Sequence, residues 1–333
     1  MVVLISGMHR SGTSMIARLL HQCGVYLGEQ NDLIPPADDN PEGFWEHAQF
    51  RELNEEILET FGGNWDFPPV LEAGWEKKDY LNLIRPRVVG LINQFSGQRI
   101  WGWKDPRNSL TLPYWKMFFP KIKVVICLRN PHDVYLSLER RGYSSSSFSY
   151  NLWLTYYNRL VAALDAGTFI VTHFESYFYN PKAEVSRVLN FLGVECSNEV
   201  IEQACLVVSP GLRNNHSSVS DLVASGASID LLRMYKNLCR QAGEIFYLSL
   251  TDEERELLEN VVSDKDLTIT DYQNVIRLLR DELAQKINQI NSLAELSQNE
   301  IVRLKNELNN IYKSRSWKLV QKLQTIKAFF VRG

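Results

Sequence analysis

The sequence has little of what marks secreted, membrane-spanning or nucleic-acid-binding proteins. It holds 5 cysteines in 333 residues, an odd number with no Cys-x-x-Cys pair, which indicates reduced thiols. No apolar run reaches the roughly 18–20 residues of a membrane helix, and the first apolar run is too short for a signal peptide. The 36 Lys and Arg against 39 Asp and Glu give a net charge of −3, which favours no broad nucleic-acid surface. We therefore expect a cytoplasmic protein without a nucleic-acid partner.

The first residues predict an anion-binding loop. Residues 2–6 have the pattern of a buried strand, and a helix pattern starts after the loop Gly7-Met8-His9-Arg10-Ser11-Gly12-Thr13-Ser14. The spacing Gly-x4-Gly-Thr-Ser is that of a P-loop, whose backbone N–H groups and helix N-terminus cradle a phosphate. Thr13 stands where nucleoside-triphosphate sites carry a lysine that reaches the β- and γ-phosphates. This favours a phosphate ligand without a γ group, with His9 and Arg10 supplying charge. A degenerate ATP or GTP site, or an ordinary strand and turn, remains an alternative.

A second segment has the same order of strand, loop and helix. Residues 123–128 form a β-branched apolar run, typical of a strand buried on both faces, and Pro131 suits the first turn of a helix. Arg129 ends the strand and Ser137 lies on the helix; a guanidinium and a hydroxyl together suit a second phosphate. Lys104 lies between the two loops, in a polar turn after a short apolar strand. A capping or surface role is the alternative for Lys104.

At these residues the chain resembles the sulfotransferases that use 3′-phosphoadenosine 5′-phosphosulfate (PAPS). His9–Ser14 is similar to their 5′-phosphosulfate loop, and Arg129…Ser137, eight residues apart, is similar to their 3′-phosphate motif. Phe174-Glu-Ser-Tyr…Asn180-Pro181 resembles their segment near the adenine, and Phe191-Leu-Gly193 resembles the end of their next helix. The order and gaps agree over about residues 1–215. The similarity is greater to bacterial and Golgi-type carbohydrate and protein sulfotransferases than to cytosolic phenol enzymes.

The resemblance implies roles for particular residues. The 5′-phosphosulfate would be held by the loop residues His9, Arg10, Ser11, Gly12, Thr13 and Ser14. Arg129 and Ser137 would bind the 3′-phosphate, and Lys104 would steady the leaving phosphate or the sulfuryl oxygens. Arg213, in a late polar loop, is a further candidate for the 3′-phosphate. Cytosolic members use a histidine two residues after the turn lysine, and this chain has Pro106 there.

The catalytic base must therefore lie elsewhere, and Glu46 is the best candidate. It follows Phe44 and Trp45 in the segment after the first predicted helix, and an apolar flank favours the neutral form of a carboxyl, which suits a base. Glu46 could instead only favour the dipole of the helix predicted over 48–61. The alternates for the base are Glu29, His47 and Asp105. No cluster of side chains suggests a metal, so we expect PAPS as co-substrate and no metal.

Strands alternate with helices, which favours an α/β fold of the P-loop type with three layers and a central parallel sheet. The predicted strands are 2–6, 99–103, 123–128 and 168–172. The predicted helices are 12–23, 48–61, 76–95, 109–118, 131–141, 149–165, 181–192 and 197–207. Because ligands bind beyond the carboxyl ends of parallel strands, we expect Arg10, Lys104, Arg129 and His173 to share one crevice.

The composition changes after residue 225, which predicts four parts: a catalytic domain 1–225, a helical connector 226–265, a coiled-coil helix 266–312 and a basic amphipathic tail 313–333. Apolar residues from Ile276 to Ile311 recur at steps of three and four, the period of a coiled coil. Such a helix must pair, and we favour a homo-oligomer over folding back on the catalytic domain. The tail could lie on an anionic membrane at its inner face, or it could be a frayed end.

These patterns together predict a sulfotransferase that moves a sulfuryl group from PAPS to an acceptor hydroxyl on a carbohydrate or glycolipid. Two other functions stay open. An ATP-dependent P-loop kinase would require Mg²⁺ and a lysine in the loop, where this chain has Thr13. A catalytically inactive interaction protein with a coiled coil would have damaged donor motifs.

Overall fold

The computed structural model describes residues 1–37, 43–142 and 145–260, and in the C-terminal part 283, 286, 287, 290, 297–308, 310 and 313. The chain divides into two compact units, Met1–Asp271 and Tyr272–Gly333. They are described separately below.

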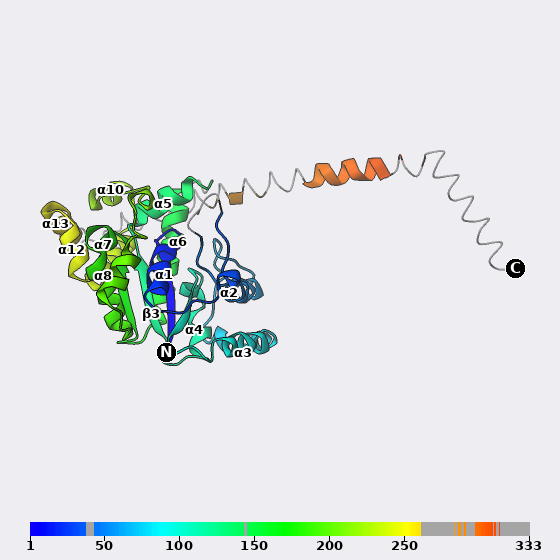
Figure 1. Cartoon of the computed structure of the whole chain (residues 1–333). Coiled ribbons are helices and arrows are strands. Elements are labelled where there is room, and N and C mark those ends of the chain that lie inside the picture. The colour runs from blue at the N-terminus through cyan, green and yellow to red at the C-terminus, as the bar shows by residue number, and fades with distance from the viewer. Residues whose placement is uncertain are drawn as a thin grey trace. The chain divides into compact units, whose positions relative to one another are not determined.

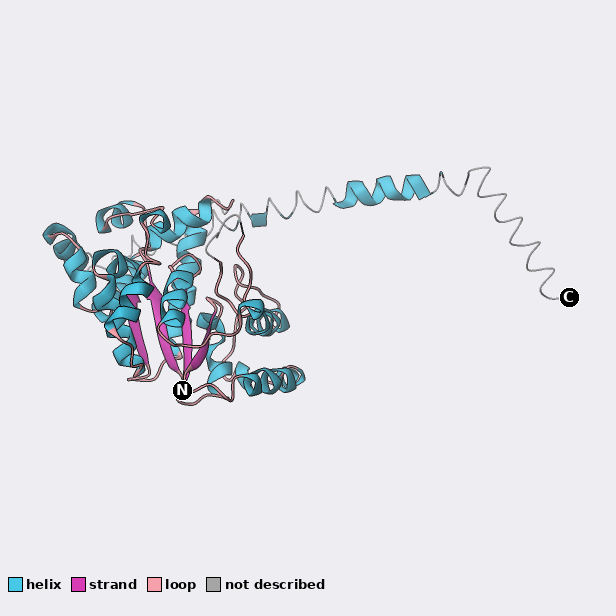
Figure 2. Ribbon diagram, in the orientation of Figure 1, coloured by secondary structure: helices cyan, strands magenta, loops and turns pink. Residues whose placement is uncertain are grey.

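The centre of the first unit is a four-stranded parallel sheet. Its strands are β1 (Val2–Gly7), β2 (Trp101–Lys104), β3 (Lys123–Leu128) and β4 (Phe169–His173), in the order β2-β1-β3-β4. Figure 2 shows these strands as one sheet surrounded by helices. The predicted parallel sheet is confirmed, and most residues of its strands are buried.

Helices cover both faces of the sheet and make three layers. Val3 and Ile5 of β1 pack on one face with the helices α1 (Thr13–Gln22), α8 (Pro181–Leu192) and α9 (Asn198–Cys205). Leu4 of β1 packs on the other face, with α2 (Ala48–Thr60), α4 (Asn108–Lys116), α6 (Ser146–Ala162) and α11 (Ile229–Gln241). Alternate residues of one strand thus supply two separate cores.

Two α-helices before residue 208 differ from the prediction. The single helix expected over 76–95 is wrong: two short 3-10 helices, Trp75–Lys77 and Asp79–Leu83, precede α3 (Arg85–Gln94). Pro86 explains the break, because proline is accepted in the first turn of a helix and not in its interior. The short helix α7 (Phe174–Tyr179) follows β4 directly and has no counterpart among the predicted elements.

Helices beyond residue 225 belong to the same core. Besides α11, they are α12 (Glu244–Ser249) and α13 (Asp252–Asn260), and α10 (Val219–Ala224) precedes them. Leu231, Tyr235, Phe246 and Leu258 are buried in the core on the α6 side of the sheet. The first unit therefore continues to Asp271, whereas the sequence placed a boundary after residue 225.

In the second unit, residues 297–308 are helical. Ile301, Leu304 and Leu308 on this helix are exposed, as are Leu283, Ile287 and Ile290 before it. Much of the predicted apolar stripe, including Ile276 and Ile311, lies outside the described residues, as does the predicted tail after Lys313. Among the residues that the structure describes, no helix has the length and apolar character needed to cross a bilayer.

Candidate functional site

The N-terminus lies at one end of the parallel sheet, so the carboxyl ends of the strands lie at the opposite end (Figure 1). Arg129 directly follows the end of β3, and Lys104 is the last residue of β2. Arg10 lies three residues after β1. Three neighbouring strands therefore deliver cations to the same edge of the sheet, as the sequence predicts.

The loop between β1 and α1 needs both of its glycines. Gly7 has φ 145°, and a Cβ there would lie 2.4 Å from the carbonyl oxygen of Cys127. Gly12 has φ 79° at the start of α1, and a Cβ there would lie 2.2 Å from the Phe174 ring. The loop closes on itself through the Ser11 N–H, which donates to the Met8 carbonyl at 3.2 Å. The result is a tight loop at a helix N-terminus, where backbone N–H groups favour an anion.

Tyr157 on α6 braces this loop against the sheet. Its hydroxyl donates to the carbonyl of Cys127 at 2.6 Å, accepts from the Met8 N–H at 3.4 Å and lies 3.4 Å from Ser11 Oγ. Burial raises the pKa of Tyr157, so the hydroxyl keeps its proton. The Ser11 side chain, which is fully buried, faces this tyrosine. Sequence reasoning missed Tyr157, because it lies on a helix far along the chain and belongs to no motif.

The two predicted phosphate motifs meet. Arg10 Nε donates to Ser137 Oγ at 2.9 Å, and Arg129 Nη1 donates to the carbonyl of Arg10 at 3.2 Å. The Arg129 guanidinium lies 4.4 Å from the centre of the Phe174 ring, and its Nε is 3.7 Å from Asp133 Oδ2. Burial lowers the pKa of Arg129, although the carboxylates of Asp133 and Glu175 oppose this shift.

His9 has a different character from the one expected. Its ring packs against Trp65 and Tyr156, with centroids 4.5 Å and 5.8 Å away. Burial lowers the pKa of His9 well below its ordinary value, and the charges of Arg107 and Lys104 lower it further. His9 is therefore neutral, and the positive charge of the loop comes from Arg10.

Lys104 and Glu46 form a buried ion pair beside the loop. Lys104 Nζ is 2.7 Å from Glu46 Oε1 and 2.8 Å from the carbonyl oxygen of Phe44. That carbonyl also accepts from Ser14 Oγ at 3.0 Å, which joins the segment before Glu46 to helix α1. Arg107 Nη1 lies 3.8 Å from Glu46 Oε2. Glu46 therefore lies between two cations and not in the apolar surroundings that Phe44 and Trp45 suggested.

Arg107, which the sequence did not single out, organises this buried cluster. It contacts Asp105 at 2.9 Å and Glu55 at 3.0 Å besides Glu46. Burial disfavours its charge, but the carboxylates of Asp105 and Glu46 outweigh burial and raise the pKa of Arg107. A buried guanidinium with several carboxylate partners holds their positions. Its place in the Lys-Asp-Pro-Arg turn was the only sequence signal for it.

The alternate bases have other partners. Both carboxylate oxygens of Asp105 are bonded, one to Asn54 and one to Arg107, each at 2.9 Å. Glu29 is exposed and accepts from the Tyr26 hydroxyl at 2.8 Å. His47 is buried against Phe50 and Phe95, and burial lowers its pKa. Glu46, in contrast, pairs with Lys104 at the end of β2.

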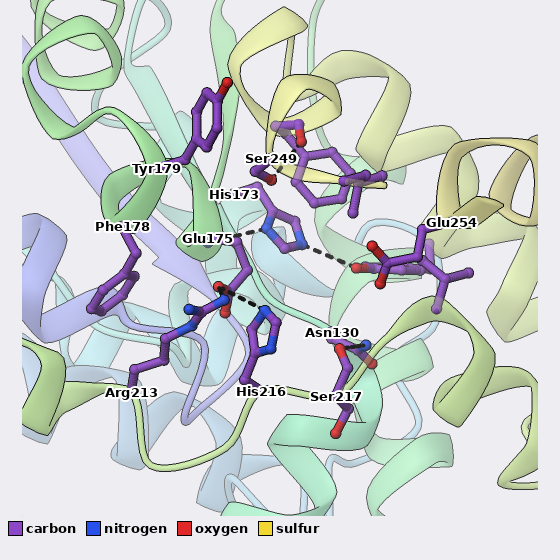
Figure 3. Close-up of a pocket in the computed structure, with 14 residues that line it drawn as sticks. Asn130, His173, Glu175, Phe178, Tyr179, Arg213, His216, Ser217, Ser249 and Glu254 are labelled. Carbon is purple, nitrogen blue, oxygen red and sulfur yellow. Dashed lines mark hydrogen bonds and ion pairs between the residues drawn. The ribbon is translucent and has the colours of Figure 1, made fainter. Parts of the chain in front are cut away.

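Arg213 pairs with Glu175, as Figure 3 shows. His216 Nε2 approaches the same carboxylate at 3.6 Å. Asn215 holds the loop in place, because its carbonyl accepts from Arg129 Nη2 at 2.9 Å. Arg213, Glu175 and His216 border a cavity of about 300 Å³ that extends to α12 and α13. Burial raises the pKa of Glu175, against the opposing charges of Arg213, His216 and Arg129.

Comparison with known proteins identifies the family. The sequence pattern described as "Sulfotransferase family" matches residues 3–198. A comparison with curated proteins finds no match. Among solved structures, a sulfotransferase from Alicyclobacillus acidocaldarius is 19% identical, with a TM-score of 0.42 over 74% of this chain and 98% of that one. A sulfotransferase from Mycobacterium tuberculosis H37Rv is 16% identical, with a TM-score of 0.40 over 70% of this chain and 75% of that one.

A retinol dehydratase, solved in complex with androsterone and the inactive cofactor PAP, is 15% identical, with a TM-score of 0.33 over 80% of this chain and 81% of that one. These structural similarities are distant, and the family assignment does not rest on them. The sequence match, in contrast, spans more than half of the chain and includes both loops that carry Arg10 and Arg129. The chain belongs to the sulfotransferase family.

Proposed function

We propose that this sulfotransferase takes its sulfuryl group from PAPS and transfers it to a hydroxyl of a carbohydrate or glycolipid. The observation that carries the donor assignment is that the loop after β1 meets both the end of β3 and helix α5 (Pro131–Glu139), with Arg10 Nε 2.9 Å from Ser137 Oγ and Arg129 Nη1 3.2 Å from the Arg10 carbonyl oxygen. Two cation-bearing loops that meet suit a nucleotide with phosphates at both its 5′ and 3′ ends. The resemblance to carbohydrate enzymes supports the acceptor class.

In this proposal the 5′ end of the donor lies at the N-terminus of α1. The backbone N–H groups of Gly12, Thr13 and Ser14 would bind it, since a helix N-terminus favours an anion. The hydroxyl of Ser14 would bind it too, because this side chain is only half-buried and a ligand can reach it. The 3′-phosphate would lie on Arg129 and Ser137, with Arg10 between the two ends. A charge-assisted bond from a guanidinium to a phosphate is among the strongest hydrogen bonds in proteins.

The transfer breaks the bond between sulfur and the bridging oxygen of the 5′-phosphate and forms a bond from sulfur to the acceptor oxygen. Lys104 would stabilise the charge that develops on the leaving phosphate, and Glu46 would take the acceptor proton. A loose transition state of this kind depends on positioning and on nearby cations more than on covalent chemistry. The 2.7 Å contact between Lys104 and Glu46 supports placing both at one reacting centre.

Calorimetry with adenosine 3′,5′-bisphosphate tests the donor site. We expect binding of this nucleotide without Mg²⁺ and no binding of ATP with Mg²⁺, whereas the reverse would favour a kinase. Arg129→Lys keeps the positive charge but loses the planar guanidinium that can bind a phosphate through two N–H groups. We therefore expect the affinity for the nucleotide to fall about tenfold or more. The matched control is Arg233→Lys on α11, where the arginine pairs with Asp230, and it should bind like the parent. Unchanged affinity in Arg129→Lys would contradict the assignment.

Turnover of labelled PAPS with extracted cell-envelope glycans tests the base and the acceptor together. Glu46→Gln should lower kcat by about 100-fold or more, because a general base contributes on that order, without weakening nucleotide binding. A variant that binds nucleotide poorly but turns over normally would exclude Glu46 as the base. Transfer only to acceptors without sugars would contradict the acceptor class.

A further inference from the structure

The turn Gly43–Glu46 occupies two groups that the proposed donor would need. Ser14 Oγ donates to the carbonyl oxygen of Phe44 at 3.0 Å, and Lys104 Nζ donates to the same oxygen at 2.8 Å. Two residues later, Glu46 Oε1 is 2.7 Å from Lys104 Nζ. One short turn thus contacts the helix that starts at the anion loop and the lysine at the end of β2.

The backbone of this turn is strained. Trp45 has φ 57°, in the left-handed region that a bulky side chain rarely adopts. Gly43 has φ 84° in the same turn, which glycine accepts without cost. The Trp45 ring packs against His21 of α1, 5.4 Å between centroids. A strained residue persists only where its surroundings fix it, and here Ser14 and Lys104 hold the carbonyl just before it.

Ser14 makes the competition with the donor exclusive. A serine hydroxyl has one proton to donate, so Ser14 cannot donate to the Phe44 carbonyl and to a donor oxygen at once. A phosphate oxygen is the stronger acceptor, because it carries charge. Lys104 Nζ has three N–H donors, of which the Phe44 carbonyl and the Glu46 carboxylate take two, so the exclusive competition is at Ser14.

We propose that the turn Gly43–Glu46 is a donor-responsive latch: its Phe44 carbonyl takes the place of the donor on Ser14 and Lys104, and donor binding releases the turn and frees the Glu46 carboxylate for the acceptor proton. This inference rests on the proposed function. It makes Trp45 a positioning residue, because its backbone stores strain that favours release. It also implies an order, in which the donor binds before the acceptor finds an active base.

A pair of substitutions at Trp45 isolates the backbone strain. Trp45→Gly and Trp45→Ala both remove the indole, but only glycine adopts φ 57° without strain. Without the strain, the closed turn should be more stable in Trp45→Gly than in Trp45→Ala, and the nucleotide has to open it. Adenosine 3′,5′-bisphosphate should therefore bind about fivefold more weakly to Trp45→Gly than to Trp45→Ala. Calorimetry measures both affinities, and thermal unfolding confirms that both variants fold. Trp45 lies outside the residues assigned to donor binding and catalysis.

Hydrogen exchange on the unmodified chain gives a second readout. Adenosine 3′,5′-bisphosphate should slow exchange at the start of α1 and speed it in the peptide that covers residues 43–47. The amide of Ile34, which donates to the Glu46 carbonyl at 2.8 Å, reports on the same turn. If the nucleotide binds but the two variants have equal affinities and exchange over 43–47 does not rise, the latch is wrong and the donor assignment stands. If the nucleotide does not bind the parent, the donor assignment fails and the latch fails with it.

Discussion

At the scale of single residues, Glu175 is the most unusual group near the site. It is a largely buried carboxylate among basic side chains, in contact with Arg213 and His216 and close to Arg129. Burial raises the pKa of its carboxyl above the ordinary value of 4.5, and the three cations only partly oppose this. The ionised form therefore lowers the stability of the folded protein, which protonation would relieve.

Glu175→Gln should therefore stabilise the protein at neutral pH. Because the pKa of Glu175 is raised in the folded state, the unfolded chain loses this proton first as pH rises above about 4.5. As the pH rises from about 4.5 to the raised pKa of Glu175, the free energy of unfolding of the parent falls. The variant has no carboxyl at this position, so it lacks this decrease. We expect a higher Tm for the variant at pH 7.5 and no difference near pH 4, measured by circular dichroism. A variant that is less stable at pH 7.5 would show that the pair with Arg213 outweighs burial.

The candidate residues at the ends of strands could be predicted from the sequence, and their partners could not. Arg10, Lys104 and Arg129 each follow an apolar strand pattern, so the topology alone brings them to one edge. Tyr157 and Asp133 lie on helices and belong to no spacing motif, although they fix the loop and the second arginine. Their roles depend on contacts between elements, which neither periodicity nor composition records.

At the scale of elements, the helix 297–308 presents an apolar stripe without a described partner. Ile301, Leu304 and Leu308 are exposed on it, although the ion pair of Arg303 with Glu300 supports the helix locally. A stripe with the coiled-coil period is stable only when it pairs. Self-association stays a prediction, and the amphipathic pattern is its support.

Removal of residues 272–333 tests this prediction. We expect the full chain to be a homo-oligomer and the shortened chain to be a monomer in multi-angle light scattering. The unit Met1–Asp271 has its own cores, so its Tm should stay nearly unchanged. Equal oligomeric states for both chains would show that the helix does not drive association.

The element boundaries show where sequence patterns are weak. The strands and most helices were predicted to within a few residues because strong apolar periods mark them. The stretch 76–95 failed because Pro86 starts a helix inside an apparently continuous pattern. Helix α7 was missed because its 6 residues are too few to show a period.

At the scale of the whole molecule, buried histidines set the response to acid. Burial lowers the pKa values of His9, His47 and His173, most strongly for His9 and His173. These groups stay neutral in the folded protein, whereas the unfolded chain binds protons once the pH falls below about 6.5. Acid therefore favours the unfolded state.

The free energy of unfolding should fall between pH 7.5 and pH 5.5, with each histidine contributing up to about 1.4 kcal/mol per pH unit below 6.5. Urea unfolding over this range measures the slope. In His47→Phe, which keeps an aromatic ring beside Phe50 and Phe95, the slope should be smaller than in the parent. Equal slopes for the parent and His47→Phe would mean that His47 is protonated in the folded protein.

The sequence predicted the parallel sheet correctly, but it did not predict that helices after residue 225 pack on that sheet. The parallel sheet follows from runs of β-branched residues that alternate with helices. Residues 226–265 were predicted to be a helical connector, yet Tyr235 and Phe246 lie in the core beside β4. Amphipathic helices do not reveal in their own sequence which surface they cover.

The strand order has one consequence for any ligand of this site. β1 lies between β2 and β3, and neighbouring strands are about 4.8 Å apart, so β2 and β3 are about 10 Å apart across the sheet. The register adds an offset along the strands, because Lys104 and Val125 both pair with Ile5 and Arg129 lies beyond Val125. The backbone pairing of the sheet sets both intervals, so a ligand that contacts Lys104 and Arg129 must bridge what their side chains leave open, and changes in the loops do not alter that spacing.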